Sequence, residues 1–427
     1  MSVKNSIPYV SRIIDPRFDR SGLRSEFRLE PDTCYYADFR LANIGFSSAS
    51  GATAYNSLLG AEVPIKSIAL LDGGTVIESV PNFHAWRPIQ KVNAPNDVNI
   101  SMGRPLSHNG LGFASNDDMN YESGAGTYGG SQNVSIVNPP GNAVGTTDAT
   151  TKKAWISLKE LFGSLRAMSL VPTNVFQELR VVVEYSTSTK LVANNTKTDL
   201  QTSLPQLYAD ELSASMIKQN AMATFQGIRY LAVEHDSFGL PAIAGMTDVP
   251  GNQTIAATIN QKLKGFNGKY MRDLILKFTP TTPQVTGGGD NRLYGQLGSQ
   301  ALWDSTIQVR VNGQNVLPRS GMRGSMRQLA CLTDTLGPCN ILWAQATVGP
   351  KNTLAVQPIQ DTVGQMSLFG VDIEELIEDL QVTVTRSGVY GNADLSARIV
   401  VDCFGRVPKA VVVGKDGRYS VVYEQTT

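Results

Sequence analysis

The sequence predicts an all-β protein built from two similar halves, with few and short helices. Three observations support this prediction. Apolar and polar residues alternate with a period of two in many short segments, which is typical of strands with one buried face. The composition is polar and rich in turn-forming residues, and 17% of the 427 residues are charged, against ~25% in an average globular domain. The order of elements in the first half also recurs in the second.

Strands of the first half are predicted by alternation and by tight turns. Phe27 and Leu29 alternate with charged residues, as in a strand with one solvent-exposed face. Apolar residues on both sides of Asp72-Gly73-Gly74 indicate a hairpin. Residues 176–185, FQELRVVVEY, contain consecutive β-branched residues that fit a buried strand.

The second half repeats these signals. Residues 306–311 alternate and lead into Asn312-Gly313, the strongest signal for a two-residue type I′ turn, because both positions need a positive φ. We therefore expect a hairpin whose second strand contains Val316. Further strands are predicted at 380–384, at 399–403 and at 409–424, the last a hairpin that turns at Lys415-Asp416-Gly417.

Three short helices are predicted. The first begins at Ser157, which forms a capping box with Glu160, and it ends before Pro172. The second covers 207–223 and the third covers 372–379. The third would bury its apolar residues and expose four carboxylates, Glu374, Glu375, Glu378 and Asp379.

A duplicated domain accounts for the repeated order of elements. In both halves a tight turn comes first and a helix followed by a strand comes later, at 157–185 and at 372–386. The predicted domains are residues 1–210 and residues 211–427, with the boundary inside 206–224. Two long stretches, 109–151 and 279–296, lack periodicity, so we expect them at subunit surfaces or contacts.

Cysteines and histidines are too scattered to predict a metal site. No C-x-x-C pair occurs, so zinc ligands would have to come from distant parts of the chain. We expect buried free thiols in a reducing compartment. His235 precedes Asp236, but adjacent strand residues face opposite ways, so we expect no dyad and a histidine at the surface or at a strand end. The residues concerned are Cys34, Cys331, Cys339, Cys403, His84, His108 and His235.

Catalytic and cofactor motifs are also missing. Gly124-Ala125-Gly126-Thr127-Tyr128-Gly129 matches G-x-G-x-x-G, but it lies in a long polar loop without the strand and helix that dinucleotide binding needs. No P-loop and no G-x-S-x-G sequence occurs. Asp117-Asp118 and the carboxylates of 374–379 lack the spacing of a calcium loop and are expected in solvent. We therefore expect no enzyme, and no catalytic, cofactor-binding or metal-binding residue.

The charge pattern argues against nucleic acid as a partner. Basic and acidic residues number 37 each and form no basic cluster, so sequence-specific nucleic-acid binding is not expected. The aromatic residues Tyr35, Tyr36, Phe39, Phe83 and Trp86 lack interleaved cations and fit a core or an interface. Without an apolar run of 18 residues we expect no transmembrane segment, and the first residues lack the apolar run of a signal peptide.

At the first helix–strand unit the sequence resembles a known family. LKELFGSLRAMSLVPTNVFQELRVVVEY (158–185), followed by Leu204-Pro205-Gln206-Leu207 and Asp210-Glu211-Leu212, resembles major capsid proteins of polinton-like viruses, adintoviruses and virophages, in the adenovirus-type capsid lineage. In that group a helix leads through a Leu-Pro turn into the last strand of the first jelly roll. GQLGSQALWDSTIQVRVNGQNVLPRSG (295–321) is similar to a segment early in their second jelly roll. The resemblance covers most of the chain, although many relatives are longer.

This resemblance implies two tandem eight-stranded antiparallel jelly rolls and three chains in each pseudo-hexagonal capsomer, or hexon, of an icosahedral DNA-virus shell. It implies four kinds of partner: other copies in a homotrimer, neighbouring capsomers, penton proteins and minor capsid proteins. The protein would be assembled inside the host cell and located in the virion. The alternative is a trimeric β-rich virion spike or attachment protein, or a carbohydrate-binding protein. A glycan binder should expose aromatic residues on one face and usually has a calcium or disulfide framework, which this chain lacks.

Overall fold

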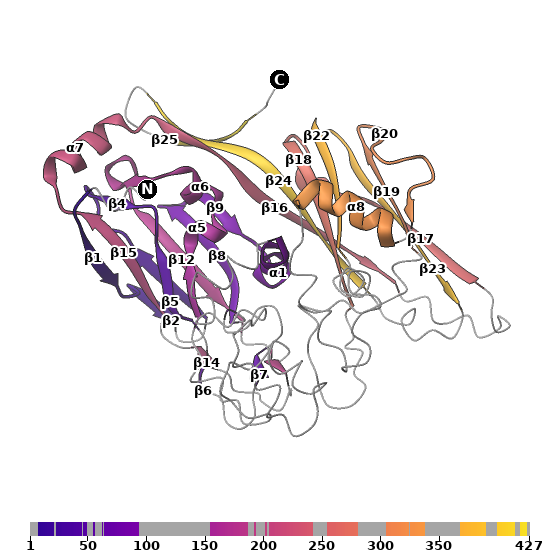
Figure 1. The fold of residues 1–427 in the computed structure, drawn as a ribbon, viewed down its shortest axis with the longest axis horizontal. Coiled ribbons are helices and arrows are strands. Elements are labelled where there is room, and N and C mark those ends of the chain that lie inside the picture. The colour runs from indigo at the N-terminus through magenta and orange to yellow at the C-terminus, as the bar shows by residue number, and fades with distance from the viewer. Residues whose placement is uncertain are drawn as a thin grey trace.

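Two pairs of antiparallel sheets make up most of the computed structural model (Figure 1). We call them the N-terminal sandwich and the C-terminal sandwich. The structure describes residues 7–20, 23–44, 46–48, 54–55, 62, 64–93, 154–186, 192–193, 201–202, 205–241, 254–280, 305–323, 325–337, 368–389, 399–414 and 419–424.

The N-terminal sandwich contains a six-stranded and a five-stranded sheet. The six-stranded sheet has the order β10-β5-β15-β4-β11, with β1 paired to β15, and the five-stranded sheet has the order β2-β3-β12-β8-β9. The strands of the first sheet are β1 (Tyr9–Ile14), β4 (Cys34–Tyr36), β5 (Arg40–Ile44), β10 (Ala154–Ser157), β11 (Leu170–Pro172) and β15 (Gln206–Leu212). Those of the second are β2 (Phe18–Arg20), β3 (Arg24–Arg28), β8 (Ile65–Asp72), β9 (Thr75–Val80) and β12 (Leu179–Tyr185).

The C-terminal sandwich contains two five-stranded sheets. One has the order β16-β24-β18-β22, with β25 paired to β24, and the other has the order β17-β23-β19-β20, with β21 paired to β19. The strands of the first sheet are β16 (Gly227–Leu240), β18 (Tyr270–Pro280), β22 (Leu368–Leu376), β24 (Ile399–Val413) and β25 (Tyr419–Tyr423). Those of the second are β17 (Thr254–Lys262), β19 (Thr306–Val311), β20 (Gln314–Asn315), β21 (Met322–Arg323) and β23 (Leu380–Val389).

The remaining elements are short. Two small sheets pair β6 (Phe46–Ser48) with β14 (Gln201–Thr202) and β7 (Ala54–Tyr55) with β13 (Val192–Ala193). The α-helices are α1 (Phe83–Asn93), α5 (Leu158–Leu161), α6 (Gly163–Ala167), α7 (Ser215–Thr224) and α8 (Ser325–Leu336). Two 3₁₀ turns, η6 (Thr173–Val175) and η8 (Lys264–Phe266), complete the described elements.

Alternating side chains build the cores of both sandwiches. In the N-terminal sandwich Val181 of β12 lies between Phe27 of β3 and Leu70 of β8, and all three side chains are buried. In the C-terminal sandwich Val384 of β23 pairs with Ile307 of β19 and is equally buried. Strand residues that face one another across a ladder lie on one face of the sheet, so the period of two in the sequence becomes a continuous apolar layer.

The predicted hairpins are confirmed, except that Val316 lies just beyond the second strand of the hairpin at Asn312-Gly313. β8 and β9 turn at Gly73-Gly74, and β19 and β20 turn at Asn312-Gly313, whose φ values of 51° and 83° fit the type I′ turn. Val316 follows β20 directly, and its N–H donates to the carbonyl of Val309 at 3.0 Å. β24 and β25 form the C-terminal hairpin, whose turn at 415–417 lies outside the described residues.

Two predicted helices are wrong in whole or in part. Residues 372–376 belong to β22, which pairs with β18, and residues 377–379 form the turn into β23. The spacing of Ile373 and Ile377 fits a helix as well as it fits a buried strand and its turn, and pairing with β18 decides between them. In the segment 207–223 only the part from Ser215 is helical, because residues 207–212 pair with β1 and β5 as β15.

The predicted capping box is wrong as well. Ser157 precedes α5, but its side chain makes no capping hydrogen bond. Phe162 then adopts an extended conformation, so that the predicted helix consists of two short pieces, α5 and α6.

Candidate assembly interface

The described cysteines lie where burial makes their thiols unreactive. Cys34 and Cys403 are buried, Cys331 is half-buried, and all three are free thiols, as predicted for Cys34 and Cys403. Burial raises the pKa of Cys34 to about 11 and raises the pKa of Cys403 well above its usual range. A thiol that stays protonated is a poor nucleophile and a poor metal ligand. Cys339 lies outside the described residues.

The two described histidines occupy the middle of the molecule, so the expectation of a surface or strand-end His235 is wrong. His235 lies within β16, and its Nε2 is 2.9 Å from Asp402 of β24. Asp236 instead accepts hydrogen bonds from the backbone N–H groups of Ser237 and Gly265, so the two neighbours face different ways, as predicted. His84 is buried on α1.

The acidic residues lie at the surface and the aromatic residues are buried. Glu374, Glu375 and Glu378 are exposed, as predicted, although they lie on a strand end and a turn rather than on a helix. Asp379 forms a surface ion pair of 3.0 Å with Lys262. The aromatic set is buried, as expected for a core or an interface: Tyr35, Tyr36, Phe39, Phe83 and Trp86.

Within the described ranges, no three His, Cys, Asp or Glu side chains come close enough together to hold a metal ion. No helix in this part of the chain is both long and apolar enough to cross a membrane. The G-x-G-x-x-G match at 124–129, Asp117-Asp118, His108 and nearly all of the loops 109–151 and 279–296 lie outside the described residues.

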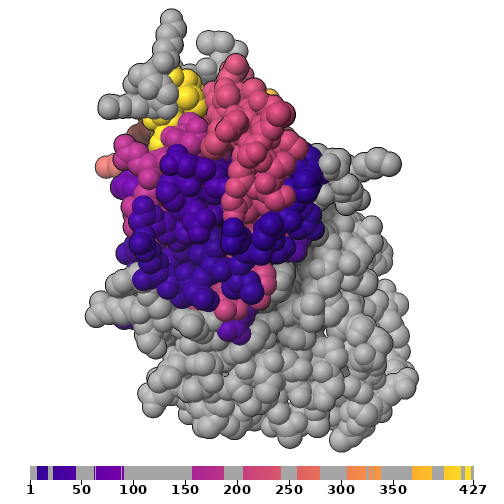
Figure 2. Space-filling model, turned by 90° about the vertical axis from the view of Figure 1, so that its left-hand side faces the viewer, coloured from indigo at the N-terminus to yellow at the C-terminus, as the bar shows by residue number. Residues whose placement is uncertain are grey.

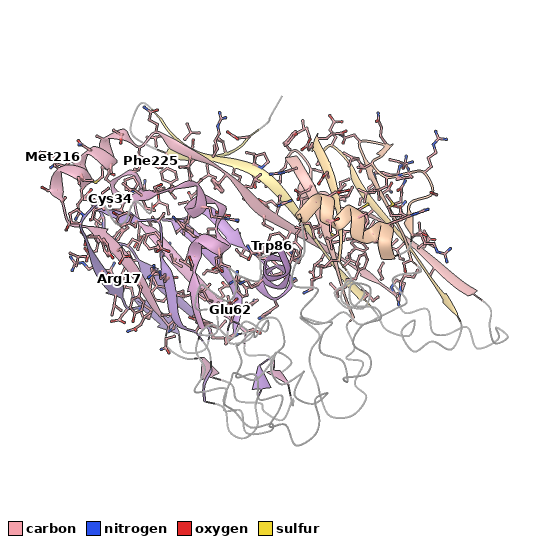
Figure 3. The ribbon with its side chains drawn as sticks, viewed as in Figure 1. Arg17, Cys34, Glu62, Trp86, Met216 and Phe225 are labelled. Carbon is pink, nitrogen blue, oxygen red and sulfur yellow. The ribbon has the colours of Figure 1, made fainter. Side chains whose placement is uncertain are left out.

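The two sandwiches contact one another through a shared sheet. The sheet that contains β16, β18 and β24 is buried on both faces. Val401 and Cys403 belong to the core of the C-terminal sandwich, whereas Phe404 and Val407 belong to the apolar cluster of the N-terminal sandwich. α1 lies between the sandwiches, where Trp86 contacts Phe404 with ring centroids 5.1 Å apart (Figures 1 and 3). One sheet therefore belongs to two cores.

A buried polar group accompanies this apolar contact. Asp402 accepts hydrogen bonds from Asn82 Nδ2 at 2.7 Å and, through the same oxygen, is 2.9 Å from His235 Nε2. Lys277 pairs with Asp402 in the β18–β24 ladder and points its Nζ toward the carbonyl of His84 at 3.4 Å. Complete burial lowers the pKa of Lys277 to about 8, although Asp402 opposes the shift. Hydrogen bonds are stronger in a buried site, because water does not compete for the same groups. These bonds therefore fix the relative position of the two sandwiches.

A second contact joins α6 to β16. Gly163 lies so close to β16 that a Cβ atom there would be 2.3 Å from the carbonyl oxygen of Leu231. Buried Glu78 accepts the backbone N–H groups of Gly163 and Ser164, each at 2.8 Å, and burial raises the pKa of its carboxyl group. Tyr230 of β16 donates to the carbonyl of Ile77 at 2.6 Å. The two sandwiches thus meet through a close approach of backbone and through buried hydrogen bonds.

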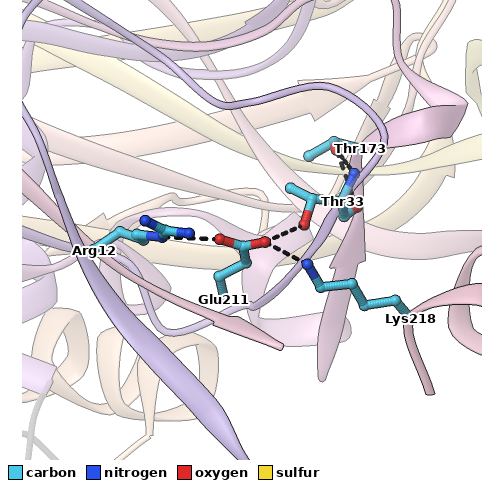
Figure 4. Close-up of polar contacts among 5 residues, drawn as sticks. All are labelled: Arg12, Thr33, Thr173, Glu211 and Lys218. Carbon is cyan, nitrogen blue, oxygen red and sulfur yellow. Dashed lines mark hydrogen bonds and ion pairs between the residues drawn. The ribbon is translucent and has the colours of Figure 1, made fainter. Parts of the chain in front are cut away.

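At the far end of the N-terminal sandwich a single carboxylate ties three elements together (Figure 4). Glu211 of β15 accepts hydrogen bonds from Arg12 of β1 at 2.9 Å, from Thr33 at 2.7 Å and from Lys218 of α7. Burial acts to raise the pKa of Glu211, but the hydrogen bonds from Lys218, Thr33 and Arg12 outweigh it and lower the pKa to about 2. Thr173 completes the group by donating to the carbonyl of Thr33 at 3.0 Å.

Figure 2 views this end of the molecule face on, and the exposed fractions of its residues show that apolar side chains reach the surface there. Met216 on α7 is 74% exposed, and β1 exposes Ile13, Val10 and Tyr9 by 56%, 47% and 43%. Ile217 of α7 and Ile7, which precedes β1, both pack against the buried cluster of Cys34, Tyr36 and Leu212. The sequence analysis did not identify this surface. Its only signal is YVSRII (9–14), in which four of six residues are apolar.

No family model matches the chain, and no curated protein matches it. Solved structures do match, and they define the class of fold: both sandwiches together form a double jelly roll. The chain is similar to PBCV-1 VP54 as fitted into a cryo-EM reconstruction of the virophage Sputnik, with a TM-score of 0.59, 11% identity and 98% of each chain covered.

Two virophage structures give the same result. The mavirus major capsid protein matches with a TM-score of 0.56 and 10% identity, covering 100% of this chain and 93% of its own. The Sputnik virophage structure matches with a TM-score of 0.58 and 10% identity, covering 98% and 89%. The predicted double jelly roll is therefore confirmed, with short and edge strands in addition to the eight expected in each roll.

Proposed function

We propose that this chain is the major capsid protein of an icosahedral DNA virus, a structural subunit located in the virion. The observation that carries the proposal is the fold match along nearly the whole chain to capsid proteins of PBCV-1 and of virophages. The match includes both jelly rolls in one chain, and a structural role does not require an active site. The proposal assigns no catalytic, cofactor-binding or metal-binding residue and no enzymatic activity.

The contact between the sandwiches supports this role physically. A shell subunit has to hold its two jelly rolls at a fixed angle, because neighbouring subunits meet both of them. The shared sheet, the Trp86–Phe404 contact and the Asn82–Asp402 hydrogen bond provide such a joint. Three copies with two jelly rolls each would supply the six sides of a pseudo-hexagonal capsomer. We propose two domains, residues 1–210 and 211–427, with the boundary inside 206–224 and the change of sandwich at α7, just after β15 ends at Leu212.

The proposed partners are other copies of the chain. We propose a homotrimer that contacts neighbouring capsomers, penton proteins and minor capsid proteins, and that is assembled inside the host cell. Symmetric assembly through large contacts suits a chain with a net charge of zero, because like copies do not repel one another. The loops 109–151 and 279–296 are proposed to lie at capsomer surfaces or contacts.

The test is the size and shape of the purified protein. Multi-angle light scattering across a dilution series should give a mass near three times 46.1 kDa that persists at low concentration. Negative-stain images should show hexagonal capsomers of uniform size. A folded monomer at micromolar concentration contradicts the proposal, and an elongated trimer without hexagonal outline favours the alternative, a spike or attachment protein.

A further inference from the structure

The last described strand, β25, contacts both sandwiches. It pairs with β24 along its whole length, from Lys409–Tyr423 to Val413–Tyr419. Figure 1 shows that β24 and β16 extend here from the C-terminal sandwich over the N-terminal one. In this part of β24 the buried side chain of Val411 belongs to the apolar cluster of the N-terminal sandwich. β25 therefore belongs to a sheet of one jelly roll and lies against the other.

The Tyr419 end of β25 is attached to the N-terminal sandwich. The Tyr419 ring meets the ring of Phe176 edge-on, with centroids 5.1 Å apart, and Phe176 is part of the N-terminal cluster. The Tyr419 hydroxyl donates a hydrogen bond to the carboxylate of Asp72, the last residue of β8, and burial together with this bond raises the pKa of Tyr419. Val421 also packs against the N-terminal cluster. Side chains of the first jelly roll thus hold this end.

The Tyr423 end is attached to the C-terminal sandwich. The Tyr423 hydroxyl donates to Glu234 of β16 at 3.0 Å. Lys409 and Lys269 hold their Nζ atoms 4.7 and 5.2 Å from the centre of the Tyr423 ring, within the range of a cation–π contact. Both lysines also form ion pairs with Glu234, at 2.6 and 3.3 Å. Four residues of extended strand separate Tyr419 from Tyr423, so the two anchors lie ~13 Å apart.

β25 itself buries little surface. None of its five residues is buried, and Ser420, Val422 and Tyr423 are exposed. The neighbouring strand β24 has buried side chains at Ala410 and Val411. Segments with few buried apolar residues open locally at a lower free energy than the core around them. β25 can therefore leave its place while both sandwiches stay folded.

We propose that β25 is a latch, which holds the two jelly rolls at a fixed angle and opens without the unfolding of either one. The latch needs both anchors, because a strand that is fixed at one end only transmits no restraint from one sandwich to the other. Its opening loosens the end of β16 that lies against α6, where Gly163 approaches Leu231. The inference goes beyond the proposed function and does not depend on it, since it concerns a joint within one chain.

Hydrogen exchange followed by mass spectrometry tests the latch on the full chain. The reporters are the backbone amides of Gly163 and Ser164, which donate to buried Glu78 beside β16. Tyr419→Ala releases one anchor and Tyr423→Ala the other, so each variant should speed exchange of the reporters about tenfold. The double variant should be no faster than either single variant, because a latch with one free end is already open. Two independent contacts would instead multiply to about a hundredfold.

Val422→Ala is the matched control. Val422 lies on the same strand but faces away from the anchors and is 40% exposed, so exchange of the reporters should not change. Exchange in β12 and in β18 reports on the two sandwich cores and should be the same in every variant. Where an alanine variant does not fold, Tyr419→Phe and Tyr423→Phe repeat the test, because each keeps the ring and removes only the hydroxyl bond. Their smaller effects should again fail to multiply.

Three results would each overturn the inference: effects that multiply in the double variant, exchange that also becomes faster in β12 and β18, and reporter exchange that stays unchanged in both single variants. The wild type gives a further check, because the amides of β25 should exchange faster than those of β18. Equal rates would show that β25 opens only when the whole sandwich unfolds, which contradicts a latch.

Discussion

The side-chain amide of Asn82 donates a hydrogen bond of 2.7 Å to the carboxylate of Asp402, 320 residues further along the chain. Asn82 immediately precedes α1 in the N-terminal sandwich, and Asp402 lies on β24, the longest strand of the C-terminal sandwich. The bond therefore crosses the contact between the two jelly rolls. Asp402 is 5% exposed, so water has little access to replace a lost partner.

Asn82→Gly should lower the free energy of unfolding by about 1–3 kcal/mol, because a buried carboxylate loses one of its hydrogen bonds. Glycine is chosen because Asn82 has a φ of 45°, which alanine tolerates poorly. Chemical denaturation followed by tryptophan fluorescence measures the change. The control is Asn260→Ala on the exposed face of β17, which should shift stability by less than about 0.5 kcal/mol. Equal effects of the two variants would show that the Asn82–Asp402 bond contributes little.

Gly163→Ala should loosen the contact between α6 and β16. The added methyl group would lie 2.3 Å from the carbonyl oxygen of Leu231, so backbone must move, and such overpacking costs about 1–3 kcal/mol. Gly74→Ala is the matched control, because its Cβ would meet nothing within 4 Å. Thermal unfolding of both variants gives the comparison, and an unchanged midpoint for Gly163→Ala would contradict the close approach.

The strands and tight turns of this fold could be predicted from the sequence, because the signals for them are local. Alternation identified β19, β23 and β24, and the positive φ that a type I′ turn requires identified Asn312-Gly313. The helices were harder. α1 contains Pro88, which argues against a helix interior, and α8 follows a turn-rich stretch, so neither was predicted.

The contacts between distant segments could not be predicted in the same way. Residues 372–376 carry helix-compatible spacing, and only pairing with β18 makes them a strand. Glu211, Arg12 and Lys218 are brought together by β1 pairing with β15 and by α7 packing beside them, which no local pattern encodes. That the chain has no catalytic, cofactor-binding or metal-binding residue remains a prediction.

Asn312 should matter beyond its turn. Its Oδ1 accepts the backbone N–H groups of Glu378 and Asp379 at 2.8 and 3.1 Å, and its Nδ2 donates to the carbonyl of Leu376 at 2.8 Å. Asn312→Gly keeps the positive φ but loses these bonds to the β22–β23 turn, and should cost about 1–2 kcal/mol in a solvent-exposed setting. Asn312→Ala should cost about 1 kcal/mol more, since alanine is also strained at this φ. Urea denaturation of both variants checks the order.

Lys277 gives the fold a dependence on alkaline pH. Complete burial lowers its pKa from 10.5 to about 8, so the folded chain disfavours the charged form. Between pH 8 and 10.5 the side chain of Lys277 is protonated in the unfolded chain but not in the folded chain. The free energy of unfolding should therefore rise as the pH goes from 8 to 10.5. Lys277→Met should remove that rise, because methionine has a similar length and no group that titrates. Paired denaturation curves at pH 7, 8.5 and 10 isolate this difference, and parallel curves for the two proteins would contradict it.

Glu211 makes the stability of the fold depend on pH in the acid range. Its pKa is lowered from 4.5 to about 2, so the folded chain favours the carboxylate that binds Lys218, Thr33 and Arg12. The contribution is fully present above pH 4.5 and is lost as the pH falls through about 2, because the unfolded chain takes up a proton first. Glu211→Gln should abolish this component and destabilise the protein at pH 7, since β1 and α7 lose their common charged partner.

Hydrogen exchange of the β1 amides should show the change locally. Exchange in β1 should be faster in Glu211→Gln than in wild type at pH 7, whereas exchange in β19, which makes no contact with Glu211, should be the same in both. Equal exchange in β1 would show that pairing with β15 holds the strand without the carboxylate.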